Sequence, residues 1–215
     1  MKWNHIIDLD QTYPHSKIWV TSDLHLFHNN AIKHATRPYK DVYENYDAVL
    51  REIEEKVKPE DFLIILGDTI WQSQTSRITN FFKALPTSRI IVVFGNHDRE
   101  KNYSEVVAQE IIMSAGRLEH IKVRIEGIEY EFNFCHYPLL TWNRKHFGSM
   151  MIHGHCHGNL DEYNESVPDL RVDVGWDSKL ANNHFIEIRE ILEHFKKKTS
   201  GEDFAKWNNA NCHIN

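Results

Sequence analysis

The sequence lacks the long apolar stretches that membrane and exported proteins carry. No stretch approaches the roughly 18 consecutive apolar residues that a membrane-spanning helix needs. The first eleven residues include Lys2, Asn4, His5, Asp8 and Asp10, so they contain no uninterrupted apolar segment of a signal peptide. The predicted location is therefore the cytoplasm, and no membrane partner is expected.

Cysteine and basic charge are also scarce. The chain has 3 cysteines, Cys135, Cys156 and Cys212, without a Cys-x-x-Cys pair. This set fits neither a disulfide framework nor a four-cysteine zinc site, which leaves reduced thiols as the simplest interpretation. The net charge of −6 argues against holding nucleic acid by bulk electrostatics, but it permits a nuclease whose metals bind the phosphate.

No internal repeat, low-complexity tract or linker divides the chain. Its 215 residues, with 41% hydrophobic content, can bury one substantial core. We predict a single domain over residues 1–198. The remaining residues, 199–215, form a polar tail whose composition is typical of a disordered segment.

The first half of the chain alternates short apolar runs with amphipathic segments. The apolar runs predict buried strands at 17–22, 62–66 and 90–94. Helical spacing of apolar residues predicts helices at 42–57 and around 73–85. Alternating strands and helices imply parallel pairing, which brings the C-terminal ends of the strands to one edge of the sheet, where ligands bind.

The second half changes to an alternating pattern. Apolar and polar residues alternate over 121–125 and 130–134, which predicts an antiparallel hairpin that turns near Gly127. Shorter strands are expected at 150–152, 170–174 and 184–188, followed by a helix at about 189–198. Together the two halves predict a mixed α/β (α+β) fold.

Residue types that bind metals follow the predicted strands directly. In chain order they are Asp23, His25, Asp68, Asn96, His97, His136, His153, His155 and His157. Because parallel strands end at the same edge of a sheet, we expect these side chains to converge. Asp68 is a candidate bridge, since one carboxylate can bind two ions about 3.5 to 4 Å apart.

Taken singly, these motifs have other interpretations. Asp23-Leu24-His25 can present two ligands on one side of an extended segment, or it can be a capping aspartate beside a surface histidine. Residues 95–98, Gly-Asn-His-Asp, also suit a β-turn, although a turn gives no reason for the histidine. The three histidines of 153–157 could belong to a histidine-rich surface loop.

Taken jointly, five motifs resemble the calcineurin-like metallophosphoesterase family. They are Asp-x-His at 23–25, Gly-Asp at 67–68, Gly-Asn-His-Asp at 95–98, His136, and Gly-His-x-His at 154–157. The resemblance covers roughly residues 17–175. The opening from Ser22 to His28 and the pair Arg37-Pro38 are similar to the small, capless bacterial and phage-type members.

The resemblance implies a four-layer α/β/β/α sandwich with a metal site at the C-terminal ends of the strands. The ligands it implies are Asp23, His25 and His157 for one ion, Asn96, His136 and His155 for the other, and Asp68 for both. It also implies that His97 stands over the substrate as a general acid and that Asp98 orients the His97 imidazole. Oxygen and nitrogen ligands suit two divalent ions such as Mn²⁺, Fe²⁺ or Zn²⁺.

The predicted reaction is hydrolysis of a phosphate ester by attack of a metal-bridging hydroxide. No insertion that would cap the site is evident, and an open cleft favours phosphodiesters, including nucleotides or nucleic acids, over phosphomonoesters. A phosphomonoesterase of the same site stays the alternative. A non-catalytic metal-binding scaffold is the alternative from another class, but a scaffold has no chemical use for His97 and Asp98.

Five further residues have competing interpretations. His28 and His153 lie beside ligand positions, where they could orient a ligand, contact the substrate or only pack a loop. Arg37 and Arg144 could form bidentate contacts to a phosphate, or they could be solvated surface residues. Cys156 occupies the variable position of the last motif and is interpreted as a packed thiol.

Overall fold

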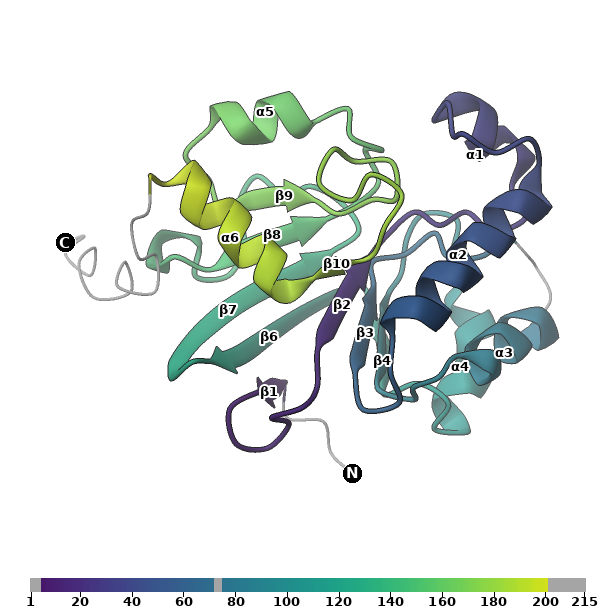
Figure 1. Cartoon of the computed structure of the whole chain (residues 1–215), viewed down its shortest axis with the longest axis horizontal. Coiled ribbons are helices and arrows are strands. Elements are labelled where there is room, and N and C mark those ends of the chain that lie inside the picture. Colours follow the sequence, from purple (N-terminus) through teal and green to yellow (C-terminus); the bar gives the residue numbers. More distant parts are fainter. Residues whose placement is uncertain (1–4, 72–74, 201–215) are drawn as a thin grey trace.

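Two five-stranded sheets pack against each other, and helices cover the outer side of one of them (Figure 1). The computed structural model describes residues 5–71 and 75–200. The strand orders are β1-β6-β7-β8-β9 and β10-β2-β3-β4-β5. This arrangement confirms the predicted mixed α/β sandwich.

The sheet β10-β2-β3-β4-β5 contains the three strands predicted from continuous apolar runs. β2 (Ile18–Thr21), β3 (Phe62–Ile65) and β4 (Ile90–Val93) are buried along their whole length and pair in parallel. β5 (Ser114–Gly116) pairs in parallel with β4, and β10 (Ile186–Glu187) pairs antiparallel with β2. The C-terminal ends of β2, β3 and β4 therefore lie at one edge.

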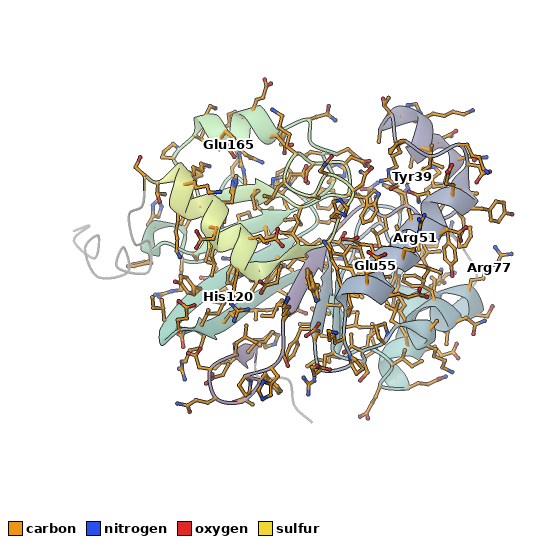
Figure 2. The ribbon with its side chains drawn as sticks, viewed as in Figure 1. Tyr39, Arg51, Glu55, Arg77, His120 and Glu165 are labelled. Carbon is orange, nitrogen blue, oxygen red and sulfur yellow. The ribbon has the colours of Figure 1, made fainter. Side chains whose placement is uncertain are left out.

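Three helices lie on the outer side of this sheet (Figure 1). They are α2 (Val42–Lys56), α3 (Thr75–Ala84) and α4 (Glu100–Ala108). Val49 and Ile53 of α2 join the core against β3 and β4, whereas Arg51 and Glu55 of the same helix are exposed (Figure 2). The predicted start of α3 at Ser73 falls outside the described residues, and α4 was not predicted.

The other sheet is built mainly on the predicted hairpin. In spatial order its strands are β1 (Ile6–Asp8), β6 (Leu118–Ile125), β7 (Ile128–Cys135), β8 (Met150–His153) and β9 (Arg171–Asp173). β6 and β7 pair antiparallel around Gly127, whose φ of 76° suits glycine. β7, β8 and β9 pair in parallel, so the segments after β7 and β8 leave the sheet at the same edge.

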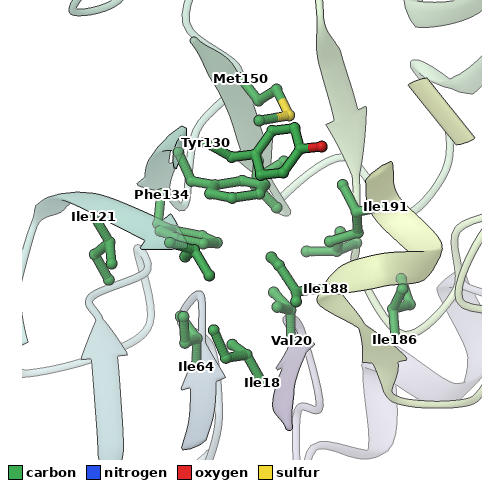
Figure 3. Close-up of a cluster of buried hydrophobic side chains, with 14 of the residues drawn as sticks. Ile18, Val20, Ile64, Ile121, Tyr130, Phe134, Met150, Ile186, Ile188 and Ile191 are labelled. Atoms are coloured by element: carbon green, nitrogen blue, oxygen red, sulfur yellow. The ribbon is translucent and has the colours of Figure 1, made fainter. Parts of the chain in front are cut away.

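The main hydrophobic core lies between the two sheets (Figure 3). Val20 and Ile64 from one sheet face Phe134 and Met150 from the other in this cluster. Helix α6 (Ile188–Lys198) adds Ile188, Ile191, Leu192 and Phe195, which recur at helical spacing and are all buried. Burial of each such side chain contributes about 1.5 to 3 kcal/mol, so the two sheets form a firm support for the loops at their ends.

The sequence did not predict the shortest elements. These are β1, β5, α1 (Asn29–His34), α5 (Asp161–Ser166) and the 3-10 turn η1 (Lys145–Phe147). They are too short for a hydrophobic period to distinguish them from loops. Within the described ranges, no helix has the length and apolar character needed to traverse a bilayer.

Glu52 of α2 links that helix to the segment before β10, and its charge is expected to stabilise the fold. The carboxylate of Glu52 accepts hydrogen bonds from Lys56, from the backbone N–H of Phe185 and from His184. Burial alone would raise the pKa of Glu52, but these bonds outweigh it and the pKa is lowered. The stabilisation is therefore present above the unfolded pKa of about 4.3 and is lost as the pH falls through the lower folded pKa.

We expect Glu52→Gln to lower the free energy of unfolding by about 1.5 to 3 kcal/mol at pH 7, the usual contribution of hydrogen bonds to a charged group. The loss should shrink as the pH falls below the unfolded pKa of about 4.3 and through the lower folded pKa, where the carboxylate of the wild type is protonated. Urea unfolding at pH 7 and at a pH below the folded pKa tests this, with the exposed Glu55→Gln on the same helix as a control. If Glu52→Gln lowers the free energy of unfolding by the same amount at both pH values, the charge-based explanation is contradicted.

Candidate metal centre

The predicted ligands converge where β2, β3 and β4 of one sheet and β7 and β8 of the other sheet end. Asp23 and His25 follow β2, Asp68 follows β3, and Asn96 follows β4, while His136 follows β7 and His155 and His157 follow β8. Residues separated by more than a hundred positions are thereby brought within a few ångströms. The carboxylate of Asp23, for example, accepts a hydrogen bond of 2.8 Å from the backbone N–H of His155.

One group of ligand atoms gathers around Asp23. Its Oδ1 atom lies 3.8 Å from Nε2 of His25 and 3.8 Å from Nε2 of His157. Nε2 of His25 also lies 3.6 Å from Oδ2 of Asp68. Because two ligand atoms that are each about 2.1 Å from one ion lie about 3 to 3.5 Å apart, these separations need only a small contraction to hold an ion.

A second group gathers around Asn96. Its Oδ1 atom lies 2.9 Å from Nε2 of His136 and 2.9 Å from Nδ1 of His155. Nε2 of His136 lies 3.7 Å from Oδ2 of Asp68. The same Asp68 oxygen is therefore close to both groups. Asp23, Asp68 and His136 also present atoms within 4.8 Å of one another, so Asp23 lies near the second group too.

The burial of these groups fits divalent cations. Oδ1 of Asp23 is buried and has no hydrogen-bond partner, and such an oxygen is costly unless a cation or a donor satisfies it. Burial raises the pKa of both Asp23 and Asp68, which means that two adjacent carboxylates are poorly compensated by the protein alone. Burial lowers the pKa of His25 to about 2, which keeps its imidazole neutral and able to bind a metal.

The backbone is strained at these positions. Five of the seven predicted ligands have left-handed φ values, namely Asp23 (57°), His25 (48°), Asp68 (50°), His155 (70°) and His157 (49°). Residues other than glycine adopt this region at a cost of about 1 to 3 kcal/mol each, and such strain concentrates at functional sites. The sequence motifs gave no indication of this conformation.

His97 lies beside the two groups but does not enter them. Its side chain is 35% exposed, and its Nε2 atom is 3.9 Å from Oδ2 of Asp68. The backbone N–H of His97 donates to Oδ1 of Asp68 at 2.9 Å. The imidazole also packs edge-on against the ring of Trp71, with 4.6 Å between the centroids. This position leaves the imidazole free to face a bound ester.

Asp98 does not orient His97, so that prediction was wrong. Its Oδ2 atom accepts hydrogen bonds of 2.8 Å from the backbone N–H groups of Asp68 and Gly95. Its Oδ1 atom accepts a bond of 2.7 Å from the hydroxyl of Tyr103. The carboxylate therefore ties together the loops that carry Asp68 and Asn96 through their backbone N–H groups.

The two histidines with competing interpretations have different surroundings. His28 stacks on Trp71, with 3.9 Å between the ring centroids and 6° between the planes, and lies next to the metal-ligand groups. His153 is fully buried, and its ring nitrogens pair with the carbonyl of Gly154 and the amide of Asn164. Burial lowers the pKa of His153 to about 4. Of the roles that the sequence left open for His153, the structure supports packing in the interior, and His153 is not among the described residues that line the cavity.

Arg37 does not contact a phosphate, because its guanidinium is buried and fully used. Nε and Nη2 donate to the two carboxylate oxygens of Asp177, each at 2.8 Å. Nη1 donates to the carbonyl of Leu24 and to Oδ1 of Asn45, and Nη2 donates to the carbonyl of Asp23. These five bonds match the five N–H donors of an arginine, so none is left for a ligand.

Arg144 is remote from the predicted ligands and partly exposed, which favours the surface position over the phosphate contact that the sequence also allowed. Its Nε atom pairs with the carboxylate of Glu131 at 2.8 Å, and its guanidinium lies over the ring of Phe147. Glu131 lies on β7, five positions before His136, which corresponds to about 16 Å of extended chain.

The two thiols that the structure describes, Cys135 and Cys156, are free, and Cys212 lies outside the described residues.

An open cavity of about 420 Å³ extends from the ligands toward α1. Its walls are formed by His25, His28, Ala31, His34, Ala35, Thr36, Asp68, Asn96, His97, His155, His157 and Asn159. Sequence reasoning missed Trp71 and Asp177, which lie beside this region. Asp177 could have been found, since it follows a strand end as the predicted ligands do.

The fold and the site agree with comparisons to known proteins. A family model for calcineurin-like phosphoesterases matches residues 16–212, so the chain belongs to the calcineurin-like phosphoesterase family. The activity of this family is metal-dependent hydrolysis of phosphate esters, which makes the chain a metal-dependent hydrolase by membership.

Two similar proteins do not indicate a substrate, because neither has an assigned function in its name. The chain is 29% identical over 148 residues to uncharacterized protein MJ1445 of Methanocaldococcus jannaschii, covering 68% of this chain and 73% of that protein. The crystal structure of the protein of unknown function AQ665 from Aquifex aeolicus is similar, with a TM-score of 0.60 and 23% identity over 84% of this chain and 100% of that one. The second likeness supports the fold.

Proposed function

We propose that the chain is a phosphodiesterase that binds two divalent ions through the seven convergent side chains. One ion would be held by Asp23, His25 and His157, the other by Asn96, His136 and His155, and Asp68 would contribute to both sites. The observation that carries this assignment is the position of Oδ2 of Asp68, which lies 3.6 Å from Nε2 of His25 and 3.7 Å from Nε2 of His136. One carboxylate oxygen thus reaches both groups.

The cavity favours a diester over a monoester. Among its described wall residues there is no lysine or arginine, and Arg37, the nearest candidate from the sequence, is fully engaged elsewhere. A diester carries one negative charge, whereas a monoester carries up to two and is commonly bound by additional cationic side chains. The imidazoles, hydroxyl and amides along the cavity suit a neutral ester group.

His97 is proposed to protonate the departing alcohol. When bound, divalent ions lower the pKa of a coordinated water and stabilise charge on the phosphoryl oxygens. The remaining requirement is a proton for the leaving oxygen. The half-exposed imidazole of His97, held beside Asp68 by its own backbone N–H, is placed to supply it.

The test compares an aryl phosphodiester, an alkyl phosphodiester and the matching aryl monoester with Mn²⁺-loaded protein. We expect diesters to be preferred in kcat/KM, and His97→Ala to lower kcat by about 10²- to 10⁴-fold for the alkyl ester, whose alcohol needs a proton. The deficit should be smaller for the aryl ester, because its phenolate leaves without one. His120→Ala, on β6 away from the cavity, is the control (Figure 2).

Each outcome has a defined meaning. Preference for the monoester would replace the phosphodiesterase proposal by a phosphomonoesterase of the same site. Equal losses for alkyl and aryl esters would remove His97 as the acid. Failure to hydrolyse any ester with two Mn²⁺ bound would favour a metal-binding scaffold.

A further inference from the structure

An ion pair between Arg37 and Asp177 lies directly behind one of the ligand groups. The Arg37 side chain is completely buried and that of Asp177 is 6% exposed. Two parallel bonds of 2.8 Å join them, the bidentate geometry that fixes both partners most firmly. Because the two residues are 140 positions apart, the pair connects the segment after α1 to the loop after β9.

Asp177 also reaches a predicted metal ligand. Its Oδ2 atom accepts a hydrogen bond of 2.6 Å from Nδ1 of His157. With Nδ1 protonated, the lone pair of the imidazole is on Nε2, the atom that lies 3.8 Å from Oδ1 of Asp23. A carboxylate in this position fixes both the tautomer and the ring orientation of a metal-binding histidine.

Arg37 also supports the Asp23, His25 and His157 group, through the backbone of the segment after β2. Its donors bind the carbonyl oxygens of Asp23 and Leu24, which lie in the segment that carries Asp23 and His25. Asp23 and His25 both have left-handed φ values, so the segment needs such contacts to keep its conformation. One guanidinium therefore supports Asp23 and His25 through the backbone and His157 through Asp177.

We propose that Arg37 and Asp177 are a positioning pair that preorganises the Asp23, His25 and His157 group to bind one divalent ion. This inference rests on the proposed metal centre. Neither residue touches the substrate. The pair sets how tightly one of the two sites binds its ion, and it leaves the Asn96 group unaffected because neither of its members contacts Asn96, His136 or His155 among the described residues.

The test is the binding of Mn²⁺ to Asp177→Asn, followed by the electron paramagnetic resonance signal of free Mn²⁺. Loss of such a supporting partner typically lowers metal affinity about 10- to 100-fold. We expect that loss at one site per chain, with the second site unchanged. Saturating Mn²⁺ should restore most of kcat, since Asp177 contributes to binding and not to the chemical step.

Asp61→Asn is the matched control. Asp61 is also a buried carboxylate with several partners, which are the backbone N–H groups of Lys17 and Lys58 and the indole N–H of Trp19. It lies before β3, at the end of the sheet opposite to the ligands. We expect Asp61→Asn to lower the melting temperature without changing either Mn²⁺ affinity.

Wild-type affinity at both sites of Asp177→Asn would overturn the proposal, as would an equal loss of Mn²⁺ affinity in Asp61→Asn. Should Asp177→Asn fail to fold, Arg37→Lys provides the same measurement, because lysine keeps the charge but cannot form the two-pronged contact. If wild-type protein binds two Mn²⁺ ions and hydrolyses no ester, the proposed function fails while the Mn²⁺ comparison still decides the role of the pair.

Discussion

Asp68→Asn is expected to lower kcat/KM for phosphodiester hydrolysis by about 10³-fold or more, because two metal ions would share its carboxylate in the proposed site. Loss of a bridging charge removes several kcal/mol of transition-state stabilisation, and each 1.36 kcal/mol is about tenfold in rate. The fold should survive, since the asparagine oxygen can still accept the bond that Oδ1 now accepts from the backbone N–H of His97.

The difference in melting temperature between Asp68→Asn and the wild type should change sign when metal is added. Burial raises the pKa of Asp68, so its ionised carboxylate disfavours the metal-free fold at neutral pH. Asp68→Asn should therefore melt at the same temperature as the wild type or higher in EDTA, but lower than the wild type in Mn²⁺. Activity within tenfold of the wild type, or two ions bound with unchanged affinity, would exclude Asp68 as the bridge.

Gly95→Ala is expected to inactivate the site without removing any ligand. A Cβ atom at Gly95 would lie 2.1 Å from Oδ1 of Asp68 and 2.7 Å from its backbone nitrogen. Both atoms are held, the first by the N–H of His97 and the second by Asp98, so the loop itself must move. Overpacking of this kind costs about 1 to 3 kcal/mol, and a displacement of about 1 Å at a reacting centre can cost about 10²-fold in rate.

Gly116→Ala provides the comparison for this prediction. A Cβ atom there would meet its nearest neighbour, Oε1 of Glu119, at 3.4 Å, which is ordinary contact. We expect kcat/KM and the urea midpoint of Gly116→Ala to stay close to those of the wild type, while both fall in Gly95→Ala. If Gly95→Ala keeps its activity, the position of Asp68 tolerates more movement than the contact implies.

Much of the fold could be predicted because its signals are local. The run Phe62 to Leu66 is apolar at every position, which is the pattern of a short strand covered on both faces, and β3 is such a strand. The alternation over 121–125 and 130–134 likewise matches the hairpin of β6 and β7. β1 and β5 escaped prediction because three residues are too few for a period, and their place in the sheets depends on partners far along the chain.

For the candidate site, the set of residues could be predicted but their individual hydrogen-bond partners could not. The convergence of parallel strand ends predicted that nine metal-binding side chains gather, and the family resemblance selected seven of them as ligands. The structure brings those seven together. The partners of single side chains were not predictable. Arg37 was considered for a phosphate contact or a solvated surface position, and Asp98 was expected to face His97. Both instead bind backbone groups of the loops that carry the predicted ligands.

The sequence by itself determined the family, the order of the main strands and helices, and the seven residues at the edge of the sheets. The order of the elements follows from hydrophobic period, whereas the family and the seven residues follow from the resemblance that the five motifs carry. Each of these signals involves neighbours along the chain. Only the tertiary structure decided that five of the predicted ligands adopt left-handed backbone conformations and that Asp177 accepts a hydrogen bond from His157. A side chain's hydrogen-bond partner depends on which loops the sheets bring together, and spacing along the chain cannot predict such a long-range contact.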